Sequence, residues 1–236
     1  MKRLKIFLLL LVVPAFLVIS CKKDEPEPEV EYKSPTAAGR TTVVDVPAGL
    51  TALAETDVNA SIVVAYFGLA NFISTYASSF IIPATATEEN KKSTSKVYTW
   101  SYQGYSYWMT YTVLADKYTW TYDWQTPEMA RFTFISAEEL KTGKAGSWAI
   151  YDPETPATKV WDYDWSINAS NTFMANLSWV EGQEVSSFVV NSNADHSGNF
   201  TYNINTEKEA EINWVVNGSG TYWLRGYPDP VIGSWQ

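Results

Sequence analysis

Aromatic side chains alternate with small polar side chains over much of the second half of this chain. Tyr98, Trp100 and Tyr102 alternate with Thr99 and Ser101. Successive side chains on a β-strand point to opposite faces of its sheet, so this period of two predicts a sheet with one aromatic face and one polar face. The same pattern recurs over 118–124, 161–167, 173–179, 200–204 and 212–216.

Turn residues stand where such strands have to reverse, and Asn217-Gly218 is the strongest two-residue hairpin signal among them. Short connections make neighbouring strands antiparallel, so we expect an up-and-down sheet of about ten or eleven strands between residues 97 and 235. Residues 136–140 resemble a capping box, which predicts one or two helical turns ended by Gly143.

A stretch without any charge, residues 58–87, precedes these strands. Apolar side chains in and before this stretch recur at spacings of three and four, which is the period of an α-helix. We therefore expect one helix over about 48–80, which Gly68 could interrupt and Pro83 ends. A helix that is apolar on nearly every side is buried, and its many Asn, Ser and Thr residues make a membrane span the weaker alternative.

These expectations combine into a mainly β (α+β) domain, in which the antiparallel sheet curls as a half-barrel around one long apolar N-terminal helix. The arrangement is similar to the half-barrel of periplasmic lipoprotein carriers and related envelope lipoproteins. A closed lipocalin-like barrel with the helix outside is the alternative. Residues 41–236 are enough for one such domain with its own core.

The N-terminus has the composition of a secretory signal. Three basic residues, Lys2, Arg3 and Lys5, precede an uncharged apolar run over 6–19, and Ser20 comes directly before Cys21, the single cysteine. The sequence Val18-Ile19-Ser20-Cys21 resembles the lipobox of bacterial lipoproteins, although that family prefers Leu where Val18 stands. The resemblance implies that residues 1–20 are removed and that Cys21 carries lipid on its sulfur and its new amino group.

The next residues, Lys22, Lys23, Asp24 and Glu25, resemble the acidic surface-export signal of lipoproteins from Bacteroidota-type bacteria. This implies a lipid anchor in the outer membrane and exposure at the cell surface. Residues 21–40 are rich in Pro, Glu and Lys and have little to bury, so we expect the lipidated cysteine to be followed by a disordered tether.

Charge and cysteine content restrict the partners. The signal contains three of the 17 basic residues and none of the 26 acidic residues, so the processed chain has a formal net charge of −12, which makes nucleic acid an unexpected partner. Expected partners are the membrane, through the lipid, and a glycan, lipid or envelope-protein ligand. Because the only cysteine is the lipid site, burial alone must hold the domain together.

No catalytic constellation is visible in the sequence. His196, the only histidine, lies in a polar turn beside an aspartate and a serine, and adjacent residues cannot easily align as a triad. One histidine and a lipidated cysteine do not supply a zinc or copper site, so we expect no metal and no cofactor. Asp123, Asp162 and Asp164 could act as acid and base on a glycosidic bond, but alternation places them on the wet face.

Trp108, Tyr151 and Trp223 are the aromatic candidates for ligand binding. If the residue before each of them faces the core, these three side chains point outward. They could form a stacking patch for a glycan or lie under a loop. The sequence favours a non-enzymatic binding protein, with a carbohydrate-binding accessory lipoprotein of a glycan-uptake system as the alternative and a glycoside-processing enzyme as the third hypothesis.

Overall fold

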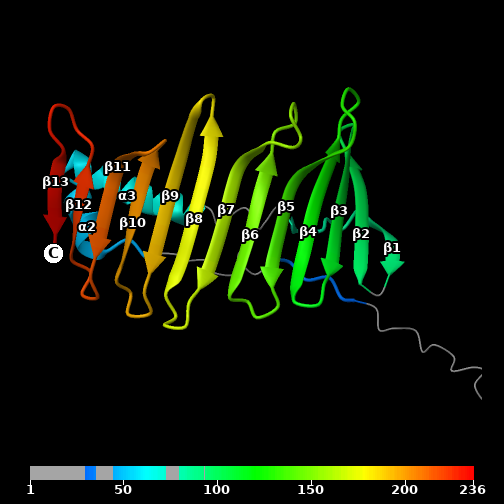
Figure 1. The fold of residues 1–236 in the computed structure, drawn as a ribbon, viewed down its shortest axis with the longest axis horizontal. Helices are drawn as coiled ribbons and strands as arrows, with labels where there is room; N and C mark the ends of the chain where they lie inside the picture. Colours follow the sequence, from blue (N-terminus) through cyan, green and yellow to red (C-terminus); the bar gives the residue numbers. More distant parts are fainter. Residues whose placement is uncertain (1–29, 36–44, 73–79, 93) are drawn as a thin grey trace, which may run out of the picture.

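The residues that the structure describes form one antiparallel sheet of 13 strands, with two short helices against one of its faces (Figure 1). The computed structural model describes residues 30–35, 45–72, 80–92 and 94–236. The strands follow one another in chain order across the sheet. Its first and last strands do not pair, so the sheet is not closed, and the alternative of a closed lipocalin-like barrel is wrong.

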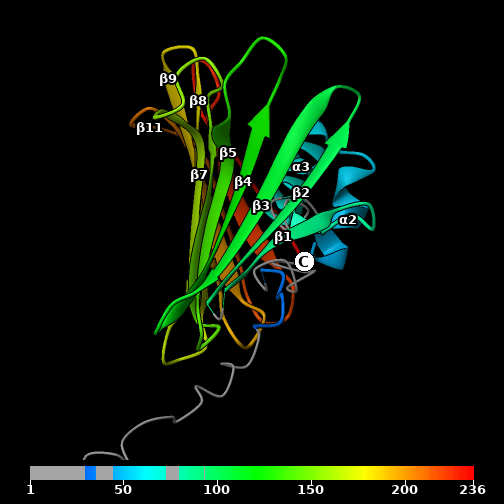
Figure 2. The ribbon, with the colours of Figure 1, turned by 90° about the vertical axis from the view of Figure 1, so that its right-hand side faces the viewer.

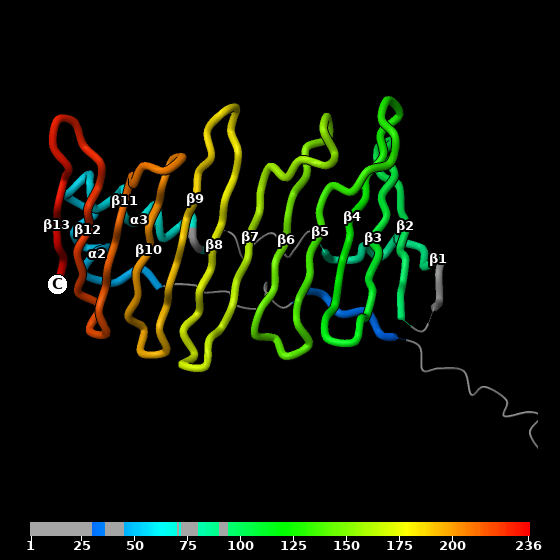
Figure 3. The backbone as a smooth tube through the Cα atoms, in the orientation of Figure 1, coloured from blue at the N-terminus to red at the C-terminus, as the bar shows by residue number. Residues whose placement is uncertain are grey.

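The helices are α2 (Ala48–Ala54) and α3 (Val58–Phe72). Short turns join most strands, as the backbone trace in Figure 3 shows. The strands are β1 (Thr87–Lys92), β2 (Ser95–Tyr102), β3 (Tyr105–Val113), β4 (Lys117–Gln125), β5 (Phe132–Leu140), β6 (Ala145–Tyr151), β7 (Lys159–Ile167), β8 (Phe173–Glu181), β9 (Glu184–Ser192), β10 (Gly198–Ile204), β11 (Glu207–Trp214), β12 (Gly220–Leu224) and β13 (Val231–Trp235).

The predicted up-and-down antiparallel topology is confirmed, but two local predictions are wrong. The strands were expected between residues 97 and 235, but the edge strand β1 lies before this range. Residues 136–140 are the end of β5 and not a helical turn. The reason is the alternation itself: Glu139 points to the aromatic face, where it is only 2% exposed, while Ser136 lies opposite Thr121 and Ala149 in the neighbouring strands.

The single long helix predicted over 48–80 is also wrong. Helix α2 ends at Ala54, and Asp57 begins a new helix because its Oδ1 accepts hydrogen bonds from the backbone N–H groups of Asn59 (2.7 Å) and Ala60 (3.2 Å). An aspartate in this position caps a helix N-terminus. Gly68 lies within α3 and does not interrupt it, and residues 73–79 of the predicted helix lie outside the described residues.

Helix α3 packs on the face of the sheet that we call the inner face. Its fully buried Phe67 lies 5.2 Å from Phe200 on β10 and 5.3 Å from Trp214 on β11, measured between ring centres. The other side of α3 is not covered, since Val58 is 70% and Ile62 is 43% exposed. The helix is therefore packed against the sheet on one side and not enclosed by it. Within the described ranges, no helix has the length and apolar character needed to cross a membrane.

Residues 30–35, which we call the strap, lie on the inner face near β2–β5 (blue in Figure 2). The Tyr32 ring stands edge-on to Tyr98 and Tyr111, with ring centres 5.5 and 5.4 Å away. The indole N–H of Trp120 donates a 2.7 Å hydrogen bond to the carbonyl oxygen of Lys33. These contacts make the strap part of the folded domain, although its residues fall within the segment 21–40 that we expected to be a tether.

Candidate ligand-binding site

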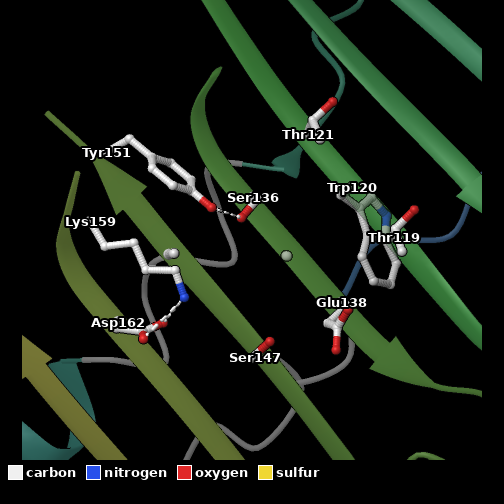
Figure 4. A pocket seen from close by; sticks show the side chains of 11 residues that line it. Thr119, Trp120, Thr121, Ser136, Glu138, Ser147, Tyr151, Lys159 and Asp162 are labelled. Atoms are coloured by element: carbon white, nitrogen blue, oxygen red, sulfur yellow. Dashed lines mark hydrogen bonds and ion pairs between the residues drawn. The ribbon is translucent and has the colours of Figure 1, made fainter. Parts of the chain in front are cut away.

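The outer face of the sheet, opposite α3 and the strap, is hollowed across strands β4–β7 (Figure 4). The hollow has a volume of about 400 Å³, within the range of roughly 300 to 1,000 Å³ that is usual for small-molecule sites. It is lined by Thr119, Trp120, Thr121, Ser136, Ala137, Glu138, Ser147, Ala149, Tyr151, Lys159 and Asp162.

Short side chains on neighbouring strands form the floor of the hollow. Thr121, Ser136, Ala149 and Asp162 lie opposite one another in β4, β5, β6 and β7. This row of side chains crosses three strand spacings, so it is about 14 Å long. The central side chains of this row are no larger than threonine. The longer side chains of Glu138, Tyr151 and Lys159 extend beyond them and form the sides of the hollow.

A β-bulge places Lys159 at this site. The register shifts between Ile150 and Tyr151, so that Tyr151 lies opposite Lys159 while Ile150 lies opposite Trp161. Strict alternation from the inward-facing Trp161 would have put Lys159 on the inner face. The extra residue in β7 turns it to the outer face instead, where its Nζ is 2.9 Å from Oδ1 of Asp162. Bulges re-aim side chains in this way and are over-represented beside active sites.

Tyr151 supplies the aromatic wall of the hollow. Its hydroxyl is 3.1 Å from Oγ of Ser136 on the neighbouring strand, and Figure 4 shows the ring standing beside the short side chains of the floor. A tyrosine held in this way offers an apolar ring face together with a polar tip.

Two ion pairs flank the floor and balance its charge. Lys159 pairs with Asp162, and Lys117 donates a 2.7 Å hydrogen bond to Glu138 on the other side. The hydrogen bond from Lys159 to Asp162 raises the pKa of Lys159 above its ordinary value, and the hydrogen bond from Lys117 to Glu138 does the same for Lys117. The site therefore presents charged hydrogen-bonding groups without a net charge, which suits a neutral polar ligand better than an ion.

The other two aromatic candidates also lie on the outer face, but cations cover them. The guanidinium of Arg131, from the loop between β4 and β5, lies 4.4 Å from the ring centre of Trp108, and the Nζ of Lys208 lies 4.4 Å from that of Trp223. Trp108 is on β3, Tyr151 on β6 and Trp223 on β12, so six strand spacings, about 29 Å, separate the last two along the sheet. The three predicted residues therefore do not form one patch, and only Tyr151 lies in the hollow.

The acidic candidates and the histidine take different roles. Asp123 is held by Arg131 (2.6 Å to Nη2) and by Thr133 (2.9 Å), which makes it part of a local polar network. Asp162 and Asp164 both point to the outer face, as alternation predicts, and only Asp162 lines the hollow.

His196 lies in the turn between β9 and β10, and its carbonyl oxygen accepts a 2.8 Å hydrogen bond from the indole N–H of Trp214. In the same turn, a hydrogen bond from the Ser197 side chain lowers the pKa of Asp195 below its ordinary value. These contacts give the turn a structural role. Among the described residues, no group of three or more His, Cys, Asp or Glu side chains is arranged to hold a metal ion.

Several lining residues were not singled out from the sequence. Ser136 and Glu138 lie in the segment that resembles a capping box, so the sequence predicts a helical turn there and not a strand. Lys159 faces the outer side only because of the bulge, which alternation does not predict. Ser147 carried one weak signal, because the Gly-Ser-Trp of residues 146–148 returns at 233–235. Cys21 and the export-signal residues 22–25 lie outside the described residues.

Comparison with known proteins adds no family to this picture. No protein-family model matches the chain, and no curated protein or solved structure matches it significantly.

Proposed function

We propose that this chain is a lipid-anchored protein of the outer membrane, displayed at the cell surface, and that it binds a glycan on the outer face of an open β half-barrel without altering it chemically. The hollow on β4–β7 is the observation that carries this proposal. Sugar rings present many hydroxyl groups and apolar C–H faces. The hollow offers serine and threonine hydroxyls, two ion pairs without net charge and the ring of Tyr151.

The inner face supports this choice because aromatic side chains near β2–β3 and near β10–β11 are already engaged. Phe200 and Trp214 contact α3, and Tyr98 and Tyr111 contact the strap. These side chains are used to hold the domain together in a protein that has no disulfide. A ligand on the outer face can be bound without opening that core.

Binding to a panel of neutral polysaccharides, measured by calorimetry, tests the glycan proposal. Tyr151→Ala and Asp162→Asn are each expected to weaken binding at least about tenfold, which corresponds to about 1.4 kcal/mol. Asp164→Asn is a matched control, because Asp164 lies on the same strand and face but outside the hollow. Trp223→Ala is the equivalent control for an outer-face aromatic. If the control variants weaken binding as much as the hollow variants, or if no glycan binds, the proposal is wrong.

The anchor has a separate test. Cys21→Ala removes the thiol that would carry lipid, so the protein should accumulate as uncleaved precursor or leave the membrane fraction. Fractionation with detection of the N-terminal peptide by mass distinguishes these forms. A processed Cys21→Ala protein that stays in the membrane fraction would contradict the lipid anchor.

A further inference from the structure

One end of the sheet is chemically different from the other. The turns β3–β4, β5–β6, β7–β8, β9–β10 and β11–β12 lie at the lower end in Figure 1, which we call the strap end because the strap runs beside it. The remaining turns, from β2–β3 to β12–β13, lie at the opposite end, which we call the far end. The two ends differ in charge and in the apolar groups that accompany it.

Two leucines project at the strap end from adjoining turns. Leu114 is 42% exposed in the β3–β4 turn, and Leu140 is 37% exposed at the start of the β5–β6 turn. The turns are joined, since the backbone N–H of Lys141 donates a 2.8 Å hydrogen bond to the carbonyl oxygen of Asp116. Both leucines therefore belong to one tip of the sheet, formed by two joined turns.

Lysines lie beside this tip, together with the exposed Asp116 of the β3–β4 turn. Lys141 and Lys144 are exposed, and neither makes an ion pair with any described residue. Lys33 of the strap and Lys141 both lie over the ring of Tyr118, 4.6 and 5.7 Å from its centre. Exposed apolar side chains combined with lysines suit the surface of a membrane that contains anionic lipids.

The strap end has a second group of exposed apolar side chains. The far end, in contrast, is acidic. In the β11–β12 turn, Val215 is 52% and Val216 is 67% exposed, and residues 215–219 carry no charge. The far end also has exposed apolar groups, but its cations Arg131, Lys159, Lys208 and Arg225 are each paired with an acid. Further acids lie there as well, and these are Asp152, Glu154, Glu181, Glu184 and Asp229. An anionic surface would attract the strap end and repel the far end.

From these observations we infer that the strap end seats on an anionic membrane surface, with Leu114 and Leu140 at the lipid headgroups and Lys141 and Lys144 facing lipid phosphates. The inference rests on the proposed lipid anchor at Cys21. Eight residues lie between Cys21 and Val30, the first residue of the strap, so nine residue-to-residue steps span at most about 30 Å. The anchor therefore holds the strap end nearest to the membrane and leaves the hollow on the outer face open to the side.

Depth-dependent quenching of a fluorescent label tests this seating. The only native cysteine is the lipid site, so Leu140→Cys and Tyr102→Cys each introduce one labelling position, at the strap end and at the far end. The full lipidated chain is placed in phosphatidylcholine vesicles with or without phosphatidylglycerol, with a nitroxide on a fraction of the headgroups. The label at position 140 should be quenched several-fold more than the label at 102, and more strongly when phosphatidylglycerol is present.

Charge variants provide the matched controls. Lys144→Glu should reduce quenching at position 140, and Lys141→Glu combined with Lys144→Glu should weaken seating further, by about fivefold per lysine. Lys208→Glu, at the far end, should leave quenching unchanged. Equal quenching at 140 and 102, no response to phosphatidylglycerol, or protection of the label by a second copy of the protein would overturn the inference.

Lipidation is measured independently of the quenching, by the mass of the N-terminal peptide. A chain that seats without lipid contradicts only the anchor, and a lipidated chain without the quenching contrast contradicts only the seating.

Discussion

At the scale of single residues, glycines on the inner face provide the space that the aromatic rings occupy. A Cβ on Gly198 would lie 2.4 Å from the ring of Trp214, and one on Gly220 would lie 2.2 Å from the ring of Trp235. In each pair the glycine and the aromatic residue lie opposite each other on adjacent strands. A glycine inside a strand weakens that strand because it has no side chain to pack. Here the ring of the residue opposite covers the glycine. Equivalent pairs are Gly146 with Trp165 and Gly233 with Tyr222.

This arrangement predicts that Gly198→Ala lowers the free energy of unfolding by about 1 to 3 kcal/mol, because the methyl group overpacks against Trp214 and the backbone oxygen of Asn191. Gly68→Ala is the matched control. Nothing lies within 4 Å of a Cβ at this position within α3, so alanine should raise the free energy of unfolding by up to about 1 kcal/mol. Urea unfolding followed by tryptophan fluorescence measures both. Equal effects of the two substitutions would contradict the packing described for Gly198.

At the scale of elements, the strap covers part of the inner face near β2–β5. Tyr32→Ala removes the ring that touches Tyr98 and Tyr111, and should lower the free energy of unfolding by about 2 to 3 kcal/mol. It should also increase cleavage by trypsin after Lys33. Glu31→Ala, an exposed neighbour, should change stability by less than about 0.5 kcal/mol. If Tyr32→Ala is as mild as Glu31→Ala, the strap is not part of the stable domain.

The same scale shows why some elements follow from the sequence and others do not. The period of two over 98–102 or 161–167 directly reflects one buried and one wet face, so these strands were predictable. Strand β1 was not, because an edge strand rich in charge lacks that alternation. The division between α2 and α3 depends on the cap at Asp57, which a purely periodic reading overlooks.

The candidate site was predictable only in part, for an equally physical reason. The outward direction of Tyr151 and Asp162 follows from alternation. Their meeting with Lys159 depends on a bulge between Ile150 and Tyr151 that no local residue preference marks. The hollow itself depends on which short side chains of four strands come into register, which is a property of the whole sheet.

At the scale of the whole molecule, the aromatic core makes the fold sensitive to alkaline pH. Burial raises the pKa of Tyr32, Tyr111 and Tyr122 to about 12 each, and burial also raises the pKa of Tyr163. The unfolded chain ionises its tyrosines at about 10. The folded state therefore binds more protons than the unfolded state between these values, and stability that is fully present below pH 10 is lost as the pH rises towards 12.

We therefore expect the domain to unfold cooperatively between about pH 10 and 12, with these tyrosines ionising in the same step. Tyrosinate absorbance and near-ultraviolet circular dichroism, recorded on one sample, should change together for the buried groups. Tyr122→Phe keeps the ring but removes an ionisable hydroxyl, so its unfolding midpoint should move to higher pH. Tyr227→Phe, at a fully exposed tyrosine, should not move the midpoint. If all tyrosines titrate near pH 10 while the dichroism stays unchanged, these four tyrosines are not buried in the folded domain as described.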